Sequence, residues 1–248
     1  MGERADRERA FHDERYADDP RVRLAPAYRA AGAARDAYRD RVAAAGAGGD
    51  ALEVGCGAGG AARVLGPVAR SLIGIDVSPV ALDAARAYVA ARSAGWPARI
   101  EFRQKDAESL SFPDGTFDLV CGGGILHHVD AVRVAAEAAR VLRPGGRAVF
   151  LEPLGHNPFV NLFRRLTPRL RSEDEHPLLE ADLDALREVF GGVQVERFAL
   201  LTPLAIPLLR WRAGLRLVAM LERADRWLFA RSSWARRWAW IVVVEARA

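Results

Sequence analysis

The chain has 248 residues and a formal net charge of +4, from 36 lysines and arginines against 32 aspartates and glutamates, and half of its residues are hydrophobic. This composition is ordinary for a globular protein, and so small a net charge is a weak argument for a nucleic-acid partner. With no run of about 18 apolar residues, no secretory-type N-terminus and only two cysteines, we expect a cytoplasmic protein without a disulfide framework or a four-ligand zinc site.

The N-terminal part is predicted to be helical. Residues 3–18 and 24–45 are rich in alanine, arginine and glutamate, and Asp19-Pro20 separates the two stretches. We expect residues 1–45 to form a helical cap on a core that covers residues 46–248.

From residue 51 onward, short apolar runs alternate with helical stretches, which is the pattern of a parallel α/β sheet. Ser78 and Asp130 are predicted helix N-caps, and the helix after Asp130 is expected to end at Pro144-Gly145-Gly146. Segments 155–180 and 201–236 do not fit the alternation, so we predict that they form cap or lid inserts. The predicted strands are residues 51–54, 71–75, 100–103, 117–121, 147–151, 193–198 and 240–245.

A glycine-rich turn, residues 52–60, follows the first predicted strand and is expected to open a helix. Gly55, Gly57 and Gly60 match the pattern G-x-G-x-x-G, in which glycines let the backbone approach a ligand closely. A helix N-terminus behind the turn would favour negative charge. The pattern alone is a weak signal, because a tight turn without a ligand would also satisfy it.

Acidic residues at the ends of the next strands sharpen this prediction. Asp76 ends the second strand, where a carboxylate can accept both hydroxyls of a ribose, and Asp106 follows the third strand, where it can accept an adenine amine. Glu53 beside the turn favours an ammonium over a diphosphate, since phosphates next to a carboxylate repel it. A nicotinamide oxidoreductase is therefore the weaker interpretation.

With these features the chain resembles the class I S-adenosylmethionine-dependent methyltransferases, in their small-molecule, type 11-like branch. The resemblance covers residues from about 50 to 152 and rests on five motifs in the family's order: LEVGCGAGG at 52–60, GIDVSP at 74–79, KDAESLSFPDGTFDLV at 105–120, LHHV at 126–129 and ARVLRPGG at 139–146. It implies a Rossmann-like seven-stranded sheet, mostly parallel with an antiparallel last strand, with helices on both faces. It also implies S-adenosyl-L-methionine as cofactor.

The resemblance further implies which residues hold this cofactor. These are Glu53 near the methionine amine, Gly55, Cys56 and Gly57 in the glycine turn, Asp76 at the ribose, Val77 on the adenine, Asp106 and Ala107 at the adenine amine and ring nitrogen, and the backbone near Cys121 and Gly122 at the methionine ammonium.

Candidates for catalysis follow the fourth and fifth strands. His127 and His128 lie in the loop that faces the cofactor's sulfur in the family, and an imidazole titrates near neutral pH, so either can act as a general base. We favour His127, although a histidine there could instead bond the loop backbone. Glu152 and His156 form a second candidate pair, and Glu152 could equally cap a turn. We expect no metal site.

The target is expected to be a hydrophobic small molecule, such as a natural product or a quinone- or lipid-like compound, methylated on oxygen, nitrogen or carbon. The chain lacks the Asn/Asp-Pro-Pro-aromatic run of nucleic-acid amino methyltransferases and the paired-glutamate loop of protein-arginine enzymes. Segment 201–236 is apolar and rich in tryptophan and arginine, so it could form a pocket or lie on a membrane surface. An alternative function is cyclisation or elimination without methyl transfer, and we expect a monomer or homodimer.

Overall fold

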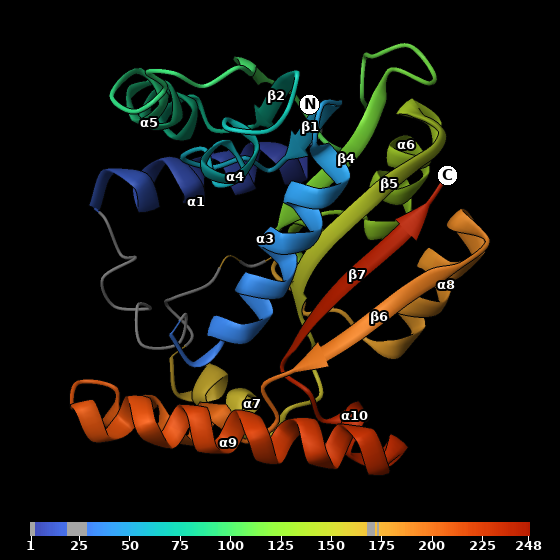
Figure 1. Ribbon diagram of the computed structural model, residues 1–248. Coiled ribbons are helices and arrows are strands. Elements are labelled where there is room, and N and C mark those ends of the chain that lie inside the picture. The colour runs from blue at the N-terminus through green and yellow to red at the C-terminus, as the bar shows by residue number, and fades with distance from the viewer. Residues whose placement is uncertain (1–2, 19–28, 168–171, 173) are drawn as a thin grey trace.

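The computed structural model describes residues 3–18, 29–167, 172 and 174–248. A single seven-stranded sheet of order β3-β2-β1-β4-β5-β7-β6 crosses the centre (Figure 1). Strands β1 to β5 pair in parallel, whereas β7 runs antiparallel to both β5 and β6. The predicted fold class is therefore confirmed, down to the antiparallel last strand.

Each predicted strand is present, and most differ by one or two residues at the ends, whereas β5 begins at Leu142, ahead of its predicted start at residue 147. The strands are β1 (Asp50–Val54), β2 (Ser71–Asp76), β3 (Arg99–Gln104), β4 (Phe117–Gly123), β5 (Leu142–Pro153), β6 (Val193–Phe198) and β7 (Ile241–Arg247). Strand β4 extends two residues beyond its predicted end, and this moves the position at which the chain leaves the sheet.

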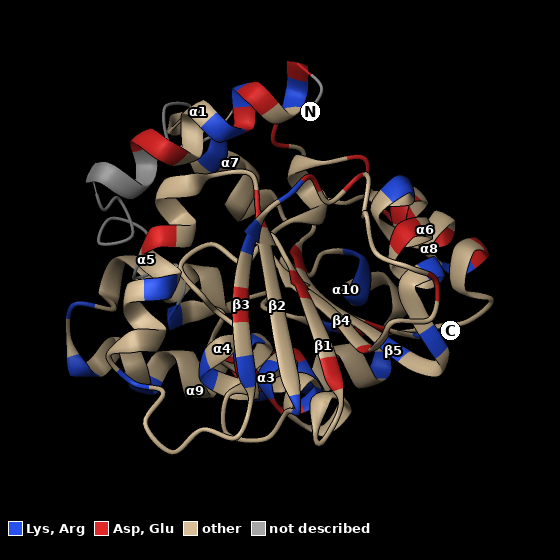
Figure 2. Ribbon diagram, turned by 90° about the horizontal axis from the view of Figure 1, so that it is seen from above, with Lys and Arg blue, Asp and Glu red and all other residues tan. Residues whose placement is uncertain are grey.

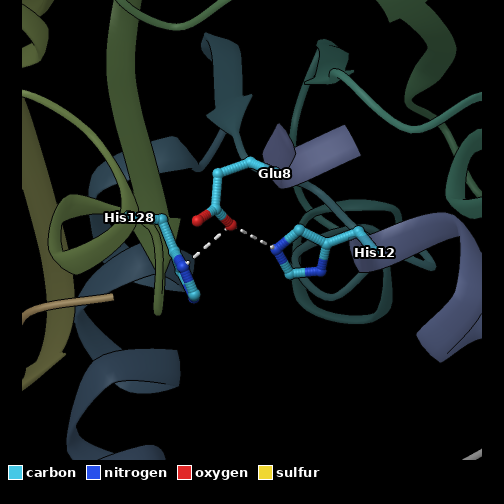
Figure 3. A group of neighbouring side chains, drawn as sticks. All are labelled: Glu8, His12 and His128. Carbon is cyan, nitrogen blue, oxygen red and sulfur yellow. Dashed lines mark ion pairs between the residues drawn. The ribbon is translucent and has the colours of Figure 1, made fainter. Parts of the chain in front are cut away.

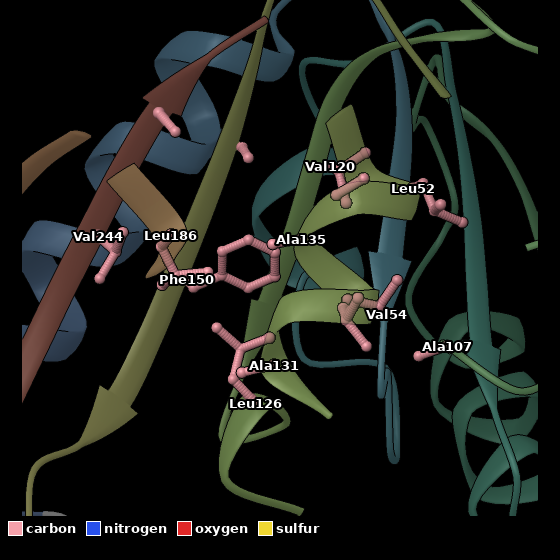
Figure 4. Close-up of a cluster of buried hydrophobic side chains, with 14 of the residues drawn as sticks. Leu52, Val54, Ala107, Val120, Leu126, Ala131, Ala135, Phe150, Leu186 and Val244 are labelled. Carbon is pink, nitrogen blue, oxygen red and sulfur yellow. The ribbon is translucent and has the colours of Figure 1, made fainter. Parts of the chain in front are cut away.

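Helices cover both faces of the sheet, and each face has its own core. Helices α3, α4 and α5 pack on one face, and α6 and α8 on the other (Figure 1). Figure 4 shows the second core, in which Phe150 of β5 and Leu186 of α8 lie among the buried aliphatic side chains of the sheet. These helices are α3 (Gly32–Gly46), α4 (Ala62–Leu65), α5 (Pro79–Ala90), α6 (Ala131–Val141) and α8 (Glu180–Phe190).

Both predicted N-caps are confirmed. The Ser78 hydroxyl accepts a hydrogen bond from the Ala81 N–H, and the Asp130 carboxylate accepts from Val132 N–H and Arg133 N–H. Because a capping side chain satisfies N–H groups that have no partner inside the helix, each one fixes where its helix begins.

The expected helix after the glycine turn is present, but it is only four residues long, α4, because the turn continues through residue 61. The predicted end of the helix after Asp130 was wrong. The helix after Asp130 ends at Val141, and β5 begins at Leu142, ahead of the proline and glycines. Gly145 has a positive φ of 81°, and its N–H donates to the Ala248 carbonyl, so this segment pairs with the chain just after β7 instead of closing the helix.

Further helices lie beyond the carboxyl ends of the strands. The helix α1 (Glu3–Asp18) carries acidic and basic residues along its length and packs against α5 (Figure 2). Segment 155–180 contains α7 (Pro158–Leu166), and segment 201–236 contains η3 (Thr202–Leu208), α9 (Arg212–Arg231) and most of α10 (Ser233–Arg237). The predicted start of the second N-terminal helix, at residue 24, and the Asp19-Pro20 break lie outside the described residues. Among the helices described, none is both long and apolar enough to cross a bilayer.

One side chain joins the two inserts. The buried Asn157 amide oxygen accepts from the Phe159 and Val160 N–H groups and so caps α7. Its Nδ2 donates to the Leu200 carbonyl at 3.1 Å and to the Trp238 carbonyl at 2.9 Å. The start of α7 is thereby tied to both ends of the second insert.

Candidate active site

A cavity of about 1020 Å³ opens at the carboxyl ends of β1, β2, β4 and β5. One wall, the sheet wall, is formed by the turns that follow these strands. The other, the helical wall, is formed by α1, α3, α7 and η3. A ligand crevice at this edge is the expected position in an open α/β sheet.

Glu53 lies at the bottom of the glycine turn and is almost completely buried. Its Oε1 accepts a hydrogen bond from the Ala61 N–H at 2.8 Å, which holds the turn closed against β1. Its Oε2 is buried and has no hydrogen-bond partner among the described residues. Burial, reinforced by the nearby Asp76 charge and only partly offset by the Ala61 N–H, raises the pKa of Glu53 to about 8. A cation bound here would satisfy the unpaired oxygen.

The glycines are required where the backbone must pass close to neighbouring groups. Gly55 has a positive φ of 63°, and a Cβ at this position would lie 2.8 Å from Ile125 Cδ1. Gly57 also has a positive φ, and its N–H donates to Asp76 Oδ2 at 2.8 Å. The second oxygen of Asp76 accepts from the Ser78 N–H at 2.9 Å, so the carboxylate is held in one orientation at the cavity wall.

Most of the predicted cofactor residues line this cavity. They are Glu53, Gly55, Cys56, Gly57, Asp76, Val77, Asp106 and Ala107. Cys121 and Gly122 are buried within β4 and do not line it, whereas Gly123 and Gly124 do. The reason is that β4 ends at Gly123, two residues later than the pattern predicted. Burial raises the pKa of both cysteine thiols well above the usual value, which leaves them unreactive.

His127 and Glu152 form a hydrogen-bonded pair at the cavity. Glu152 is fully buried at the end of β5, and its Oε1 accepts from the N–H groups of Ile125 and Leu126, both at 2.9 Å. Its Oε2 lies 2.7 Å from His127 Nδ1. Glu152 therefore shapes the loop after β4 and also holds the His127 ring, which lines the cavity.

The neighbouring His128 is directed to a different partner. Its Nδ1 lies 3.1 Å from Oε2 of Glu8 on α1, and the same oxygen lies 3.4 Å from His12 Nε2 (Figure 3). Burial lowers the pKa of His128 more than the Glu8 carboxylate raises it. Burial acts to raise the pKa of Glu8, yet His12, His128 and Ser172 together hold it well below its usual range.

His156 does not join this group. It lies just after β5, and it is not among the residues that line the cavity. Its neighbour Asn157 is the capping residue that joins the two inserts. Of the second predicted pair, only Glu152 therefore lies at the cavity.

Several cavity residues were not singled out from the sequence. Tyr38 of α3 lies beside Gly123, and burial raises the pKa of its hydroxyl well above the usual value. Glu8 and His12 of α1 also line the cavity. Their spacing of four residues, which places two side chains on one helix face, was the available signal for the last pair.

The comparisons with known proteins agree with this geometry. Residues 52–150 match the family described as "Methyltransferase domain". The chain is 30% identical over 146 residues to the uncharacterized methyltransferase YcgJ of Bacillus subtilis, covering 58% of this chain and 56% of that protein. It is 35% identical over 144 residues to the 27-O-demethylrifamycin SV methyltransferase of Amycolatopsis mediterranei, covering 57% of this chain and 46% of that protein. The chain thus spans about half the length of these curated relatives.

Solved structures show the same fold. The crystal structure of YcgJ superposes with a TM-score of 0.58 at 18% identity, covering 86% of this chain and 98% of that one. The crystal structure of the [4+2]-cyclase SpnF gives a TM-score of 0.56 at 23% identity, covering 86% of this chain and 80% of that one. From the sheet order, the glycine turn with its carboxylates and the sequence matches together, we conclude that residues 52–150 form a methyltransferase domain.

Proposed function

We propose that the chain transfers a methyl group from S-adenosyl-L-methionine to a hydroxyl group of a hydrophobic small molecule. The observation that carries this proposal is the His127–Glu152 pair at the cavity, because a hydroxyl acceptor needs a base and a neutral amine does not. A hydroxyl must lose its proton as it attacks, whereas a neutral amine can attack first.

The cavity residues fit the cofactor. The unpaired, buried Oε2 of Glu53 would take the methionine ammonium, and Asp76, with both oxygens fixed by backbone N–H groups, would take the ribose hydroxyls. Asp106 and the backbone of Ala107 would hold the adenine. When bound, the cofactor supplies a methyl group activated by its sulfonium charge.

The protein's own contribution is orientation and proton removal. Glu152 Oε2 accepts the Nδ1–H of His127, so the imidazole presents Nε2 as a proton acceptor. After His127 takes the proton from the acceptor hydroxyl, the carboxylate of Glu152 stabilises the imidazolium. A positioned base of this kind contributes about 10²–10⁴-fold, and alignment of the reacting atoms contributes more.

The part of the helical wall formed by α7 and η3 favours a hydrophobic acceptor. Its apolar side chains are partly exposed, and they are Phe159, Leu162, Phe163 and Leu166 on α7 and Leu204 on η3. Apolar side chains that remain exposed around a cavity favour an apolar ligand. The rifamycin methyltransferase, by its name, also methylates an oxygen of a natural product, which agrees with this class of substrate.

The test is an incubation of the purified chain with S-adenosyl-L-methionine and a panel of hydroxylated hydrophobic compounds, with matched amines and carbon acids. Mass spectrometry of the products should show the gain of one methyl group on phenols or alcohols, with release of S-adenosylhomocysteine. Methylation of amines or carbon acids only would contradict an oxygen acceptor. A product with unchanged or dehydrated mass, formed only when the cofactor is bound, would instead support cyclisation or elimination.

A further inference from the structure

Three potential metal ligands meet where the N-terminal helix covers the cavity. Glu8 and His12 lie one turn apart on α1, and His128 lies in the loop after β4, next to His127 (Figure 3). The proposed methyl transfer uses none of these three side chains.

The ligand atoms of the three residues all lie within 4.8 Å of one another, and two of the separations are those of atoms that share a metal ion. Glu8 Oε2 lies 3.4 Å from His12 Nε2 and 3.1 Å from His128 Nδ1. In a tetrahedral zinc site with bonds of about 2.0–2.1 Å, neighbouring ligand atoms are roughly 3.3 Å apart. A cation could therefore be bound with only small side-chain adjustments.

The contacts of Glu8 leave one of its carboxylate oxygens available to a cation. Its Oε2 is buried and accepts no hydrogen bond from the described residues, although both imidazoles are close to it. Its Oε1 is already engaged, because it accepts the hydroxyl of Ser172. Ser172 thus orients the carboxylate from outside, as outer-shell partners of metal ligands do.

Against the expectation from the sequence, we propose that Glu8, His12 and His128 bind one divalent cation of the Zn²⁺ type, with its fourth position open to the cavity. Two imidazoles and one carboxylate form a donor set that suits Zn²⁺, and three protein ligands leave a position for water or a ligand oxygen. All three residues line the cavity, so this open position faces the side where the methyl acceptor is expected. The ion would also fasten α1 to the loop that carries His127.

A second group, His127, His128 and Glu175, shares His128 and is a weaker candidate. His127 Nδ1 already bonds Glu152, and Glu175 already pairs with Arg164 at 2.7 Å. Glu175 would have to leave Arg164 to bind a cation, and His127 Nε2 is the nitrogen that the proposed methyl transfer uses, whereas Glu8 Oε2 makes no hydrogen bond among the described residues.

The test is a metal titration of the untagged, full-length chain after treatment with a chelator. Calorimetry with Zn²⁺, and visible absorption with Co²⁺ as a spectroscopic substitute, should show one tightly bound equivalent. Glu8→Gln and His12→Ala should each weaken binding by more than the roughly 10–100-fold that the loss of an outer-shell partner costs. His176→Ala is the matched control, because it removes an exposed histidine outside both groups and should leave binding unchanged.

Binding of S-adenosyl-L-methionine to each variant serves as the check that it is folded. Absence of a stoichiometric site in the wild type, or equal metal affinity in all variants, would overturn the proposal. So would loss of binding in His127→Ala together with retention in His12→Ala, which would place the ion at the second group. Because the titration uses neither a methyl acceptor nor turnover, its failure is separate from a failure of the proposed methyl transfer.

Discussion

The two walls of the cavity hold their charged groups by different means. In the wall formed by the sheet, the carboxylates of Glu53, Asp76 and Glu152 accept hydrogen bonds from backbone N–H groups. In the wall formed by α1, Glu8 is held by side chains alone. Backbone donors are fixed by the fold, so the carboxylates of the sheet wall are held in fixed orientations. The helical wall can change by single substitutions, and we place the choice of acceptor there.

The largest expected effect is on the proposed base. His127→Ala should lower kcat by about 10²–10⁴-fold while the affinity for S-adenosyl-L-methionine stays within a few-fold, because the imidazole removes a proton and does not hold the cofactor. Single-turnover kinetics and calorimetry measure the two quantities separately. An undiminished kcat with phenol or alcohol acceptors would rule out this role of His127.

A matched pair of leucines compares the stability of the two regions. Leu186→Ala should lower the free energy of unfolding by about 2–5 kcal/mol, because Leu186 is buried between α8 and the sheet. Leu166→Ala on α7 should change it by less than about 0.5 kcal/mol, because that side chain is 73% exposed. Urea unfolding of both variants measures the difference, and equal losses would mean that the helical wall is as well packed as the core.

We expect that binding of the cofactor releases a proton from Glu53. The methionine ammonium favours the ionised carboxylate, so a group with a pKa of about 8 must release a proton when the cofactor binds near pH 7. Calorimetry in two buffers of different ionisation enthalpy should detect this proton. In Glu53→Gln the release should disappear and affinity should fall by about 10–150-fold, equivalent to about 1.5–3 kcal/mol for a hydrogen bond to a charged group.

The same carboxyl gives a stability profile without cofactor. Its pKa is raised from 4.5 to about 8, so its contribution to the free energy of unfolding is fully present below about pH 4.5 and is lost as pH rises to about 8. Urea unfolding across this range should show wild-type stability falling relative to Glu53→Gln. A parallel profile for the two proteins would contradict the raised pKa.

The smallest expected effect concerns the apolar wall. Phe163 of α7 lines the cavity and is 44% exposed. Phe163→Ala should raise KM for a hydrophobic acceptor by about 5–30-fold, as the loss of about 1–2 kcal/mol of apolar contact would, and leave cofactor affinity unchanged. Steady-state kinetics with the acceptor that gives methylated product checks this, and an unchanged KM would place the acceptor elsewhere in the cavity.

The difference between the sheet wall and the helical wall also explains what could be predicted from the sequence. Glu53, Asp76 and the glycine turn belong to short sequence motifs that fold locally, so their positions at the cavity could be predicted before the structure was known. The exact end of β4 could not be predicted, because a run of glycines can either continue a strand or form a turn. Which of the two occurs depends on pairing with β5. Glu8 and His12 were missed because their partner, His128, is more than a hundred residues away, and only the tertiary fold brings them together.

The single amide of Asn157 also has a consequence for engineering. Because it fastens the start of α7 to the Leu200 and Trp238 carbonyls, which flank the second insert, the two inserts form one mechanical unit. Exchanging only one insert between related enzymes would leave buried polar groups unpaired, at a cost of roughly 1–3 kcal/mol for each. Transferring both inserts together, with Asn157 kept in place, should therefore change the acceptor preference without destabilising the helical wall of the cavity.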